Sequence, residues 1–177
     1  MKKNLILIQF LLISVTVLSQ DIQTNLRTQL NEYLVAFTQG DTERAVNYIY
    51  PDLFVWMEKK AKNEGYKYGL EDMKKDFAES LAEMNRIISQ TPKKVKFFWS
   101  LEDLEKIAEV NNYIIYICKT SLIGKIENEE IKLGDVTVCI SSDRGITWRF
   151  LNRDDENCPE ILRIRFADSI VQKVMAK

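Results

Sequence analysis

The sequence predicts an α+β fold, with N-terminal helices packed on an antiparallel sheet, and two observations carry this prediction. Between residues 21 and 92, apolar residues recur at intervals of three and four, which is typical of amphipathic helices. After Pro92, runs rich in β-branched and aromatic residues follow one another with no helical pattern between them. Helices followed by consecutive strands favour an antiparallel sheet over an alternating parallel one.

Residues 1–19 have the three parts of a secretory signal peptide. Lys2 and Lys3 form a charged start, a mainly apolar run follows over residues 5–18, and the segment ends at the small residue Ser19. An uncleaved membrane anchor is the alternative, but the run is shorter than the roughly 20 apolar residues of a spanning helix. We therefore expect an exported protein, periplasmic or extracellular, with no stable membrane span after cleavage. Residues 20–177 then form a single α+β domain.

Charge and residue content exclude several kinds of chemistry. The chain of 177 residues has no histidine, so it contains no Ser-His-Asp triad, Cys-His dyad or histidine-ligated metal. After cleavage, 23 basic residues stand against 26 acidic ones, a net charge of −3 with no basic cluster, so we expect no nucleic-acid partner. The acidic loops lack the pattern of a calcium-binding loop, and we expect no metal site and no cofactor.

The helical half is divided by glycine and proline. The first amphipathic pattern covers residues 21–39 and ends at Gly40. Asp41 or Thr42 can cap a second, short helix, which Pro51 ends and after which a third segment opens. A loop between two glycines then leads to a long helix over residues 70–88, which Pro92 closes.

The second half predicts strands, then a short helix. Residues 95–99, 104–110, 113–126, 131–140 and 146–151 have strand patterns. Asn111 and Asn112 predict a two-residue turn, because asparagine tolerates positive φ. Pro159 can begin a last helix, and the pattern of the tail after Asp168 fits either a helix or a strand.

The three cysteines leave two alternatives open. If Asn128 and Glu129 form a two-residue loop, Cys118 lies opposite Cys139, and a disulfide could join them in an exported protein. Buried free thiols are the other alternative, and Cys158 would then be a third such thiol.

Residues 141–148 match the pattern S-x-D-x-G-x-T-W and so resemble an Asp-box. Asp143 can accept hydrogen bonds from its own turn, Gly145 can supply a positive φ, and Trp148 can pack on the strand. The motif occurs once, whereas a propeller needs several blades. We interpret it as a structural turn.

Aromatic residues gather in both halves of the chain. Most of them must pack in the core, but some can line a ligand pocket between the helices and the sheet. The candidate ligand-binding residues are Tyr48, Tyr50, Phe54, Trp56, Trp99 and Tyr116. No residue is singled out as catalytic.

Two segments carry a resemblance to a known superfamily. Residues 37–54, FTQGDTERAVNYIYPDLF, have a Gly-Asp step before a short helix and end in a Y-P-x-L-F step, and residues 143–150 have a D-x-G-x-T-W-x-F strand entry. With the order of elements, they resemble the nuclear-transport-factor-2-like branch of the cystatin-like α+β superfamily, and more narrowly uncharacterised exported proteins of Bacteroidetes-type bacteria. The resemblance implies helices packed on a curved antiparallel sheet in a cone-like architecture. Enzymes of that superfamily often use an Asp–His pair, which this chain cannot form.

Three functions follow as hypotheses. The first is an exported, non-enzymatic binding module that holds a small apolar molecule or a protein partner in the cone. The second is a lyase or isomerase that uses a carboxylate and a tyrosine, which requires the two groups within hydrogen-bond reach in a pocket. The third is a structural module that forms a homodimer through an exposed sheet face.

Overall fold

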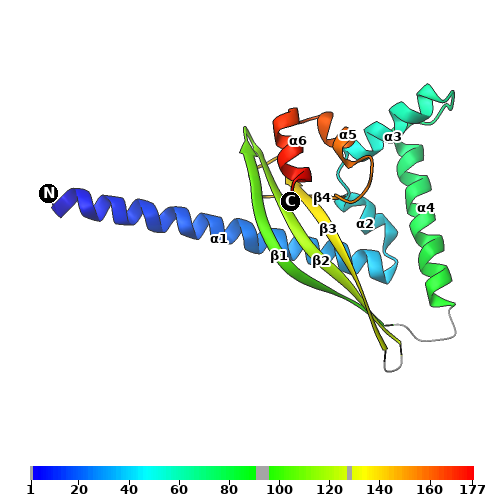
Figure 1. Ribbon diagram of the computed structural model, residues 1–177, viewed down its shortest axis with the longest axis horizontal. Coiled ribbons are helices and arrows are strands. Elements are labelled where there is room, and N and C mark those ends of the chain that lie inside the picture. The colour runs from blue at the N-terminus through cyan, green and yellow to red at the C-terminus, as the bar shows by residue number, and fades with distance from the viewer. Residues whose placement is uncertain (1, 91–95, 127–128) are drawn as a thin grey trace.

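The structure is a computed structural model that describes residues 2–90, 96–126 and 129–177. Four helices precede a four-stranded sheet, and two short helices follow it (Figure 1). The elements are α1 (Lys2–Gln39), α2 (Thr42–Tyr48), α3 (Asp52–Asn63), α4 (Leu70–Ser89), β1 (Lys96–Val110), β2 (Tyr113–Ile126), β3 (Glu129–Ser141), β4 (Arg149–Asn152), α5 (Cys158–Arg163) and α6 (Asp168–Met175). This arrangement is the predicted α+β fold.

Three predicted helix boundaries, at Gly40, Asp41 and Pro51, are confirmed. Gly40 follows α1 with φ of +76°, a conformation that glycine adopts without steric cost. Asp41 caps α2, because its Oδ1 accepts a hydrogen bond from the Arg44 backbone N–H at 3.2 Å. Pro51 is the N-cap of α3. Pro92 and the hairpin residue Asn128 lie outside the described residues.

Helix α1 begins well before the predicted residue 21. Its N-terminal part projects away from the rest of the molecule (Figure 1). Among the described residues, no helix is both long enough and apolar enough to cross a membrane.

The sheet is open, antiparallel and visibly bent, with the strand order β1-β2-β3-β4 (Figure 1). The prediction of two separate strands over residues 95–110 is wrong, because β1 is one strand through this region. Its register with β2 shifts between Leu101 and Asp103 and again between Lys106 and Ala108. Such bulges bend a strand without ending it, and they interrupt the alternation from which we inferred a break.

The register of β2 and β3 differs by two residues from the predicted one. Cys118 lies opposite Thr137, and Cys139 lies opposite Tyr116. The cysteines are therefore diagonal neighbours, which are typically about 7–8 Å apart between Cα atoms, beyond the usual reach of a disulfide. All three cysteines are free and buried. The disulfide alternative is thus wrong in this structure, and burial raises the pKa of Cys118 to about 12.

Helices cover both faces of the sheet. On the face that we call the α1 face, Leu26, Leu30 and Leu34 of α1 pack with Tyr116 and Phe150. On the opposite face, the α5/α6 face, β-strand side chains pack under the two C-terminal helices; they are Ile115, Ile117, Val138, Ile140 and Leu151. Neighbouring strand residues alternate between faces, so the inner strands contribute side chains to the hydrophobic cores on both faces of the sheet. The tail after Asp168 is helix α6, whose Val171 and Val174 are buried.

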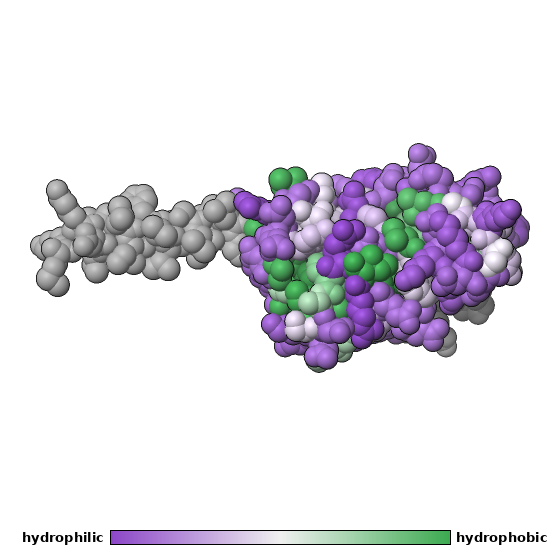
Figure 2. Space-filling model, turned by 90° about the horizontal axis from the view of Figure 1, so that it is seen from above, coloured by the Kyte–Doolittle hydropathy of each residue, from purple (hydrophilic) through white to green (hydrophobic). Residues whose placement is uncertain are grey.

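The surface bears on the homodimer hypothesis. An exposed sheet face rich in Ile and Val would favour it, but the inner Ile and Val residues of β2 and β3 are buried under helices. On the face shown in Figure 2, apolar side chains occur in small separate areas among hydrophilic ones. The described part of the chain therefore shows no exposed sheet face rich in Ile and Val, the feature that would favour a dimer through the sheet.

Candidate functional site

A pocket of about 240 Å³ lies between α1, α4 and the α1 face of the sheet, and we call it the cone pocket. Most of its lining is apolar and aromatic. The lining residues that matter for its chemistry are Tyr33 and Phe37 of α1, Phe77 of α4, Trp99 of β1, Asp135 of β3 and Phe150 of β4. The pocket is slightly smaller than the sites of drug-sized ligands, so it suits a small molecule.

The aromatic wall of the cone pocket follows from helix and strand periodicity. Tyr33 and Phe37 are four residues apart, so they lie on the same side of α1. The Tyr33 ring stacks on the Phe150 ring with 5.1 Å between centroids, and the Phe37 centroid is 6.3 Å from that of Tyr33. These contacts fix the shape of the pocket, because each ring is held by a neighbour from another turn or element.

Trp99, which lines the cone pocket, has a buried hydrogen-bond donor without a partner in the described part of the chain. Its indole Nε1 is fully buried and has no hydrogen-bond partner among the described residues. A buried donor without an acceptor costs about 1–3 kcal/mol, and most buried donors are satisfied. Trp148 has a second such nitrogen, but it is packed in the α1-face core and does not line the cone pocket.

The cone pocket also contains a carboxyl group in an apolar setting. Burial raises the pKa of Asp135 above its usual value, although the Val136 backbone N–H donates to its Oδ1 at 2.9 Å. Burial raises the pKa of Tyr33 to about 12, and the nearby Asp135 charge adds to that shift. Both groups therefore hold their protons more firmly than they would in water.

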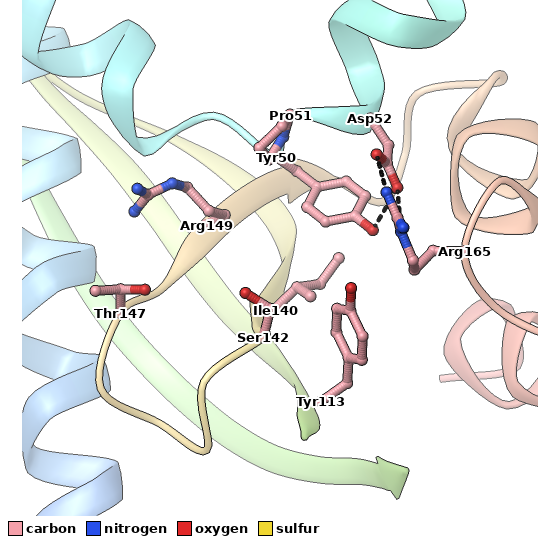
Figure 3. Close-up of a pocket in the computed structure, with 9 residues that line it drawn as sticks. All are labelled: Tyr50, Pro51, Asp52, Tyr113, Ile140, Ser142, Thr147, Arg149 and Arg165. Atoms are coloured by element: carbon pink, nitrogen blue, oxygen red, sulfur yellow. Dashed lines mark hydrogen bonds and ion pairs between the residues drawn. The ribbon is translucent and has the colours of Figure 1, made fainter. Parts of the chain in front are cut away.

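A second pocket, of about 260 Å³, has a different chemistry, and we call it the polar pocket (Figure 3). It lies beside the α5/α6 face of the sheet, with Ile140 in its lining. Its polar lining residues are Tyr50, Asp52, Tyr113, Ser142, Arg149 and Arg165. They come from the start of α3, two strands, the loop after β3 and the segment after α5, so only the fold brings them together.

Asp52 is the centre of the hydrogen bonds in the polar pocket. The Tyr50 hydroxyl donates to its Oδ2 at 2.9 Å. Arg165 donates from Nε to the same oxygen at 3.2 Å and from Nη2 to Oδ1 at 3.0 Å. Asp52 is buried, whereas about half of the Arg165 side chain is exposed. This arrangement fastens the segment after α5 to the start of α3.

The structure does not bring the six predicted ligand-binding residues to one place. Trp99 lines the cone pocket and Tyr50 lines the polar pocket. Trp56 lies in a surface groove between α3 and α5, where its Nε1 donates to Glu160 at 2.9 Å. The Lys60 ammonium lies 4.9 Å from the centre of the Trp56 ring.

The other three candidates pack against neighbouring aromatic rings. The Tyr48 ring lies 5.9 Å from that of Phe150. Phe54 makes an edge-to-face contact with Phe77 at 5.9 Å, and Tyr116 makes one with Trp148 at 5.8 Å. These geometries are typical of aromatic core packing.

Several pocket residues were not predicted. Tyr33 and Phe37 are part of the apolar stripe of α1, and a stripe does not show which of its members faces a pocket. Asp135 could have been found from the sequence, because it lies two and four residues before Thr137 and Cys139 and so lies on the same face of the strand. A carboxylate at such a position is unusual. Arg165 could not be found from the sequence, because its partner Asp52 is 113 residues away.

The loop from Ser141 to Trp148 forms the predicted turn. Asp143 Oδ1 accepts from the backbone N–H groups of Ile146 and Thr147, at 3.2 and 2.8 Å. Gly145 has φ of +92°, and Trp148 is completely buried. The turn also docks on α1, where Asn25 donates to the Gly145 carbonyl at 2.6 Å.

No group of three or more Cys, Asp or Glu side chains able to hold a metal ion occurs among the described residues. Comparison of the chain with protein-family models finds no match. Comparisons with curated proteins and with solved structures also find no match. The assignment to the cystatin-like superfamily therefore stays a prediction from the sequence.

Proposed function

We propose that this protein is an exported binding module that holds a small, mainly apolar ligand in the cone pocket. The proposal depends on Trp99, which lines the pocket and whose indole N–H is buried without an acceptor among the described residues. A ligand with one carbonyl or ether oxygen would complete this hydrogen bond while its apolar part contacts the aromatic wall. Pockets with an apolar lining and a few polar groups typically bind such ligands.

The carboxylate–tyrosine hypothesis is less well supported. Its required pair occurs at Tyr50 and Asp52, within hydrogen-bond reach in a pocket. A general base must be free to accept a proton, but Asp52 is engaged by the Tyr50 hydroxyl and by two nitrogens of Arg165. In the cone pocket, no hydrogen bond joins Tyr33 to Asp135 among the contacts of the described residues. Both arrangements favour binding over catalysis.

The three tryptophans of the chain make a direct test practicable, because a ¹⁵N-labelled sample gives three indole N–H signals. Acetophenone, an aromatic ring with one carbonyl oxygen, is the probe. We expect titration to move the Trp99 signal while the Trp56 and Trp148 signals stay in place. Trp99→Phe and Trp56→Phe assign the signals.

The same two variants are a matched pair for affinity. Trp99→Phe removes the free donor, and we expect acetophenone to bind about tenfold more weakly. Trp56→Phe removes an indole whose N–H is already bonded to Glu160, and we expect unchanged affinity. An unmoved Trp99 signal at saturating probe, or equal loss of affinity in both variants, would contradict the proposal.

A further inference from the structure

We propose that the polar pocket is a second binding site, for a small ligand with a carboxylate or phosphate group. The site is on the opposite side of the sheet from the cone pocket and does not depend on the function proposed for that pocket. Its lining contains two arginines and one aspartate, a net charge of +1 in a chain whose overall net charge is −1. The local charge is therefore opposite to that of the whole molecule and favours an anion.

Arg165 is held in place as an anion receptor. Asp52 binds its Nε and Nη2, which fixes the guanidinium plane. The remaining nitrogen, Nη1, has no hydrogen-bond partner among the described residues, and the side chain is about half exposed. An arginine that is oriented by a buried carboxylate loses little conformational freedom when it binds a ligand.

Arg149 supplies the second cation. It lines the pocket from β4, and its guanidinium extends away from the Tyr50 ring on the side opposite Arg165 (Figure 3). Its Nη1 donates to the Trp148 carbonyl at 2.9 Å, and no acidic partner is bonded to it in the described part of the chain. Arg149 is thus an oriented cation without a neutralising carboxylate. Guanidinium groups of this kind bind carboxylates and phosphates through charge-assisted hydrogen bonds.

The rest of the lining suits the body of a small ring-containing ligand. The rings of Tyr50 and Tyr113 and the side chain of Ile140 provide apolar surface. The Tyr113 hydroxyl points toward the Tyr50 and Arg165 side of the pocket (Figure 3), and it makes no hydrogen bond within the described residues. Tyr113 is itself held by an edge-to-face contact with Phe166 at 5.2 Å. The pocket therefore combines fixed aromatic walls, a free hydroxyl and two cations.

Benzoate and phenyl phosphate are the probes, and benzamide is the neutral control of the same shape. We expect isothermal titration calorimetry at low ionic strength to show binding of at least one anion and an affinity for benzamide at least about tenfold lower. Benzoate and phenyl phosphate distinguish a carboxylate site from a phosphate site. Equal affinity for benzamide and benzoate, with no binding of phenyl phosphate, would overturn the proposal, as would no binding of either anion.

Arg149→Gln tests the site without touching the Asp52–Arg165 ion pair. We expect it to weaken binding of the anion about tenfold and leave the unfolding midpoint in urea close to that of the parent protein. Arg163→Gln is the matched control, since it removes one exposed arginine that is paired with Asp168 outside the pocket. Equal loss of affinity in both variants would show a general charge effect and overturn the proposal. Trp99→Phe should leave benzoate binding unchanged, so this test is separate from that of the cone pocket.

Discussion

The cone pocket and the polar pocket lie on opposite sides of one sheet. They differ in whether their buried polar groups have hydrogen-bond partners within the chain. Neighbouring residues of β4 line the two pockets, since Phe150 lines the cone pocket and Arg149 lines the polar pocket. In the polar pocket, the buried carboxylate of Asp52 is bonded to Tyr50 and Arg165. In the cone pocket, the buried Trp99 N–H has no partner among the described residues.

This difference separates structural polar groups from candidate ligand-binding ones. A buried group whose partners come from the same chain contributes to stability, and its loss leaves another buried group unpaired. A buried group that lines a pocket and has no partner costs stability until a ligand binds. The polar pocket has groups of both kinds. Asp52 is bonded to Tyr50 and Arg165, whereas Arg149 has no acidic partner and Nη1 of Arg165 has no hydrogen-bond partner among the described residues.

The largest effect is expected from the polar pocket's ion pair. Arg165→Met should lower the free energy of unfolding by about 2–3 kcal/mol, because it leaves the Asp52 carboxylate buried without a cation; solvent around Arg165 reduces the effect below that of a fully buried pair. Urea denaturation measures it. Arg163→Met, which breaks an exposed pair with Asp168, should cost less than about 1 kcal/mol. Equal costs would show that burial of Asp52 does not matter.

The turn from Ser141 to Trp148, which contacts α1, gives the next effect. Gly145→Ala should destabilise the protein by about 2 kcal/mol, because φ is +92° and the added Cβ would lie 3.1 Å from two carbon atoms of Ile22. Gly65→Ala, with φ of +87° and open space, should cost about 1 kcal/mol. Gly134→Ala has neither problem and is the control, which should not destabilise. Thermal unfolding of the three variants checks this order, and a reversal of Gly145 and Gly65 would contradict the contact with α1.

Removal of one hydrogen-bond donor from each pocket sharpens the comparison. Tyr50→Phe should lower the free energy of unfolding by about 1 kcal/mol, because the hydroxyl bonded to Asp52 is lost. Trp99→Phe should change it less, even though it removes more atoms, because the lost N–H has no partner to leave behind. Urea denaturation without ligand compares them. A larger cost for Trp99→Phe would mean that its N–H is satisfied in solution.

The smallest effect concerns pH. Burial raises the pKa of Asp135 in the folded protein above its value in the unfolded protein. The protonated Asp135 side chain therefore makes its full contribution to stability below the unfolded-state pKa. This contribution is lost as the pH rises through the folded-state pKa. Asp135→Asn should therefore be slightly more stable than the parent protein at neutral pH, and the difference should vanish as pH falls below about 3.8, the usual value for aspartate. Unfolding measured from pH 3 to 7 checks it. A difference that grows toward acid would show that the pKa is lowered instead.

Local patterns predicted the fold better than they predicted the pockets. Gly40, Asp41 and Pro51 act within a few residues of themselves, so their roles at helix ends can be inferred from the sequence. The same holds for the Asp143 turn. The β1 bulges and the β2–β3 register could not be inferred, because they depend on how strands pair, and a shift of two residues preserves the alternation of faces.

The pockets require contacts between residues far apart in the chain. Trp99 was among the predicted aromatic residues, but its unpartnered N–H is a property of the assembled core. The Asp52–Arg165 pair joins residues 113 apart. The prediction placed the aromatic residues near Pro51 in one ligand site because they are close in sequence. In the structure, Tyr50 and Phe54 belong to different hydrophobic clusters.

The most direct test of a ligand in the cone pocket is native mass spectrometry of the protein purified from the cells that make it. We expect the parent protein to carry a reproducible extra mass that disappears on denaturation, and we expect this mass to be lost or strongly reduced in Trp99→Phe but kept in Trp56→Phe. A bare mass for the parent protein, or an extra mass that Trp99→Phe retains in full, would contradict the account.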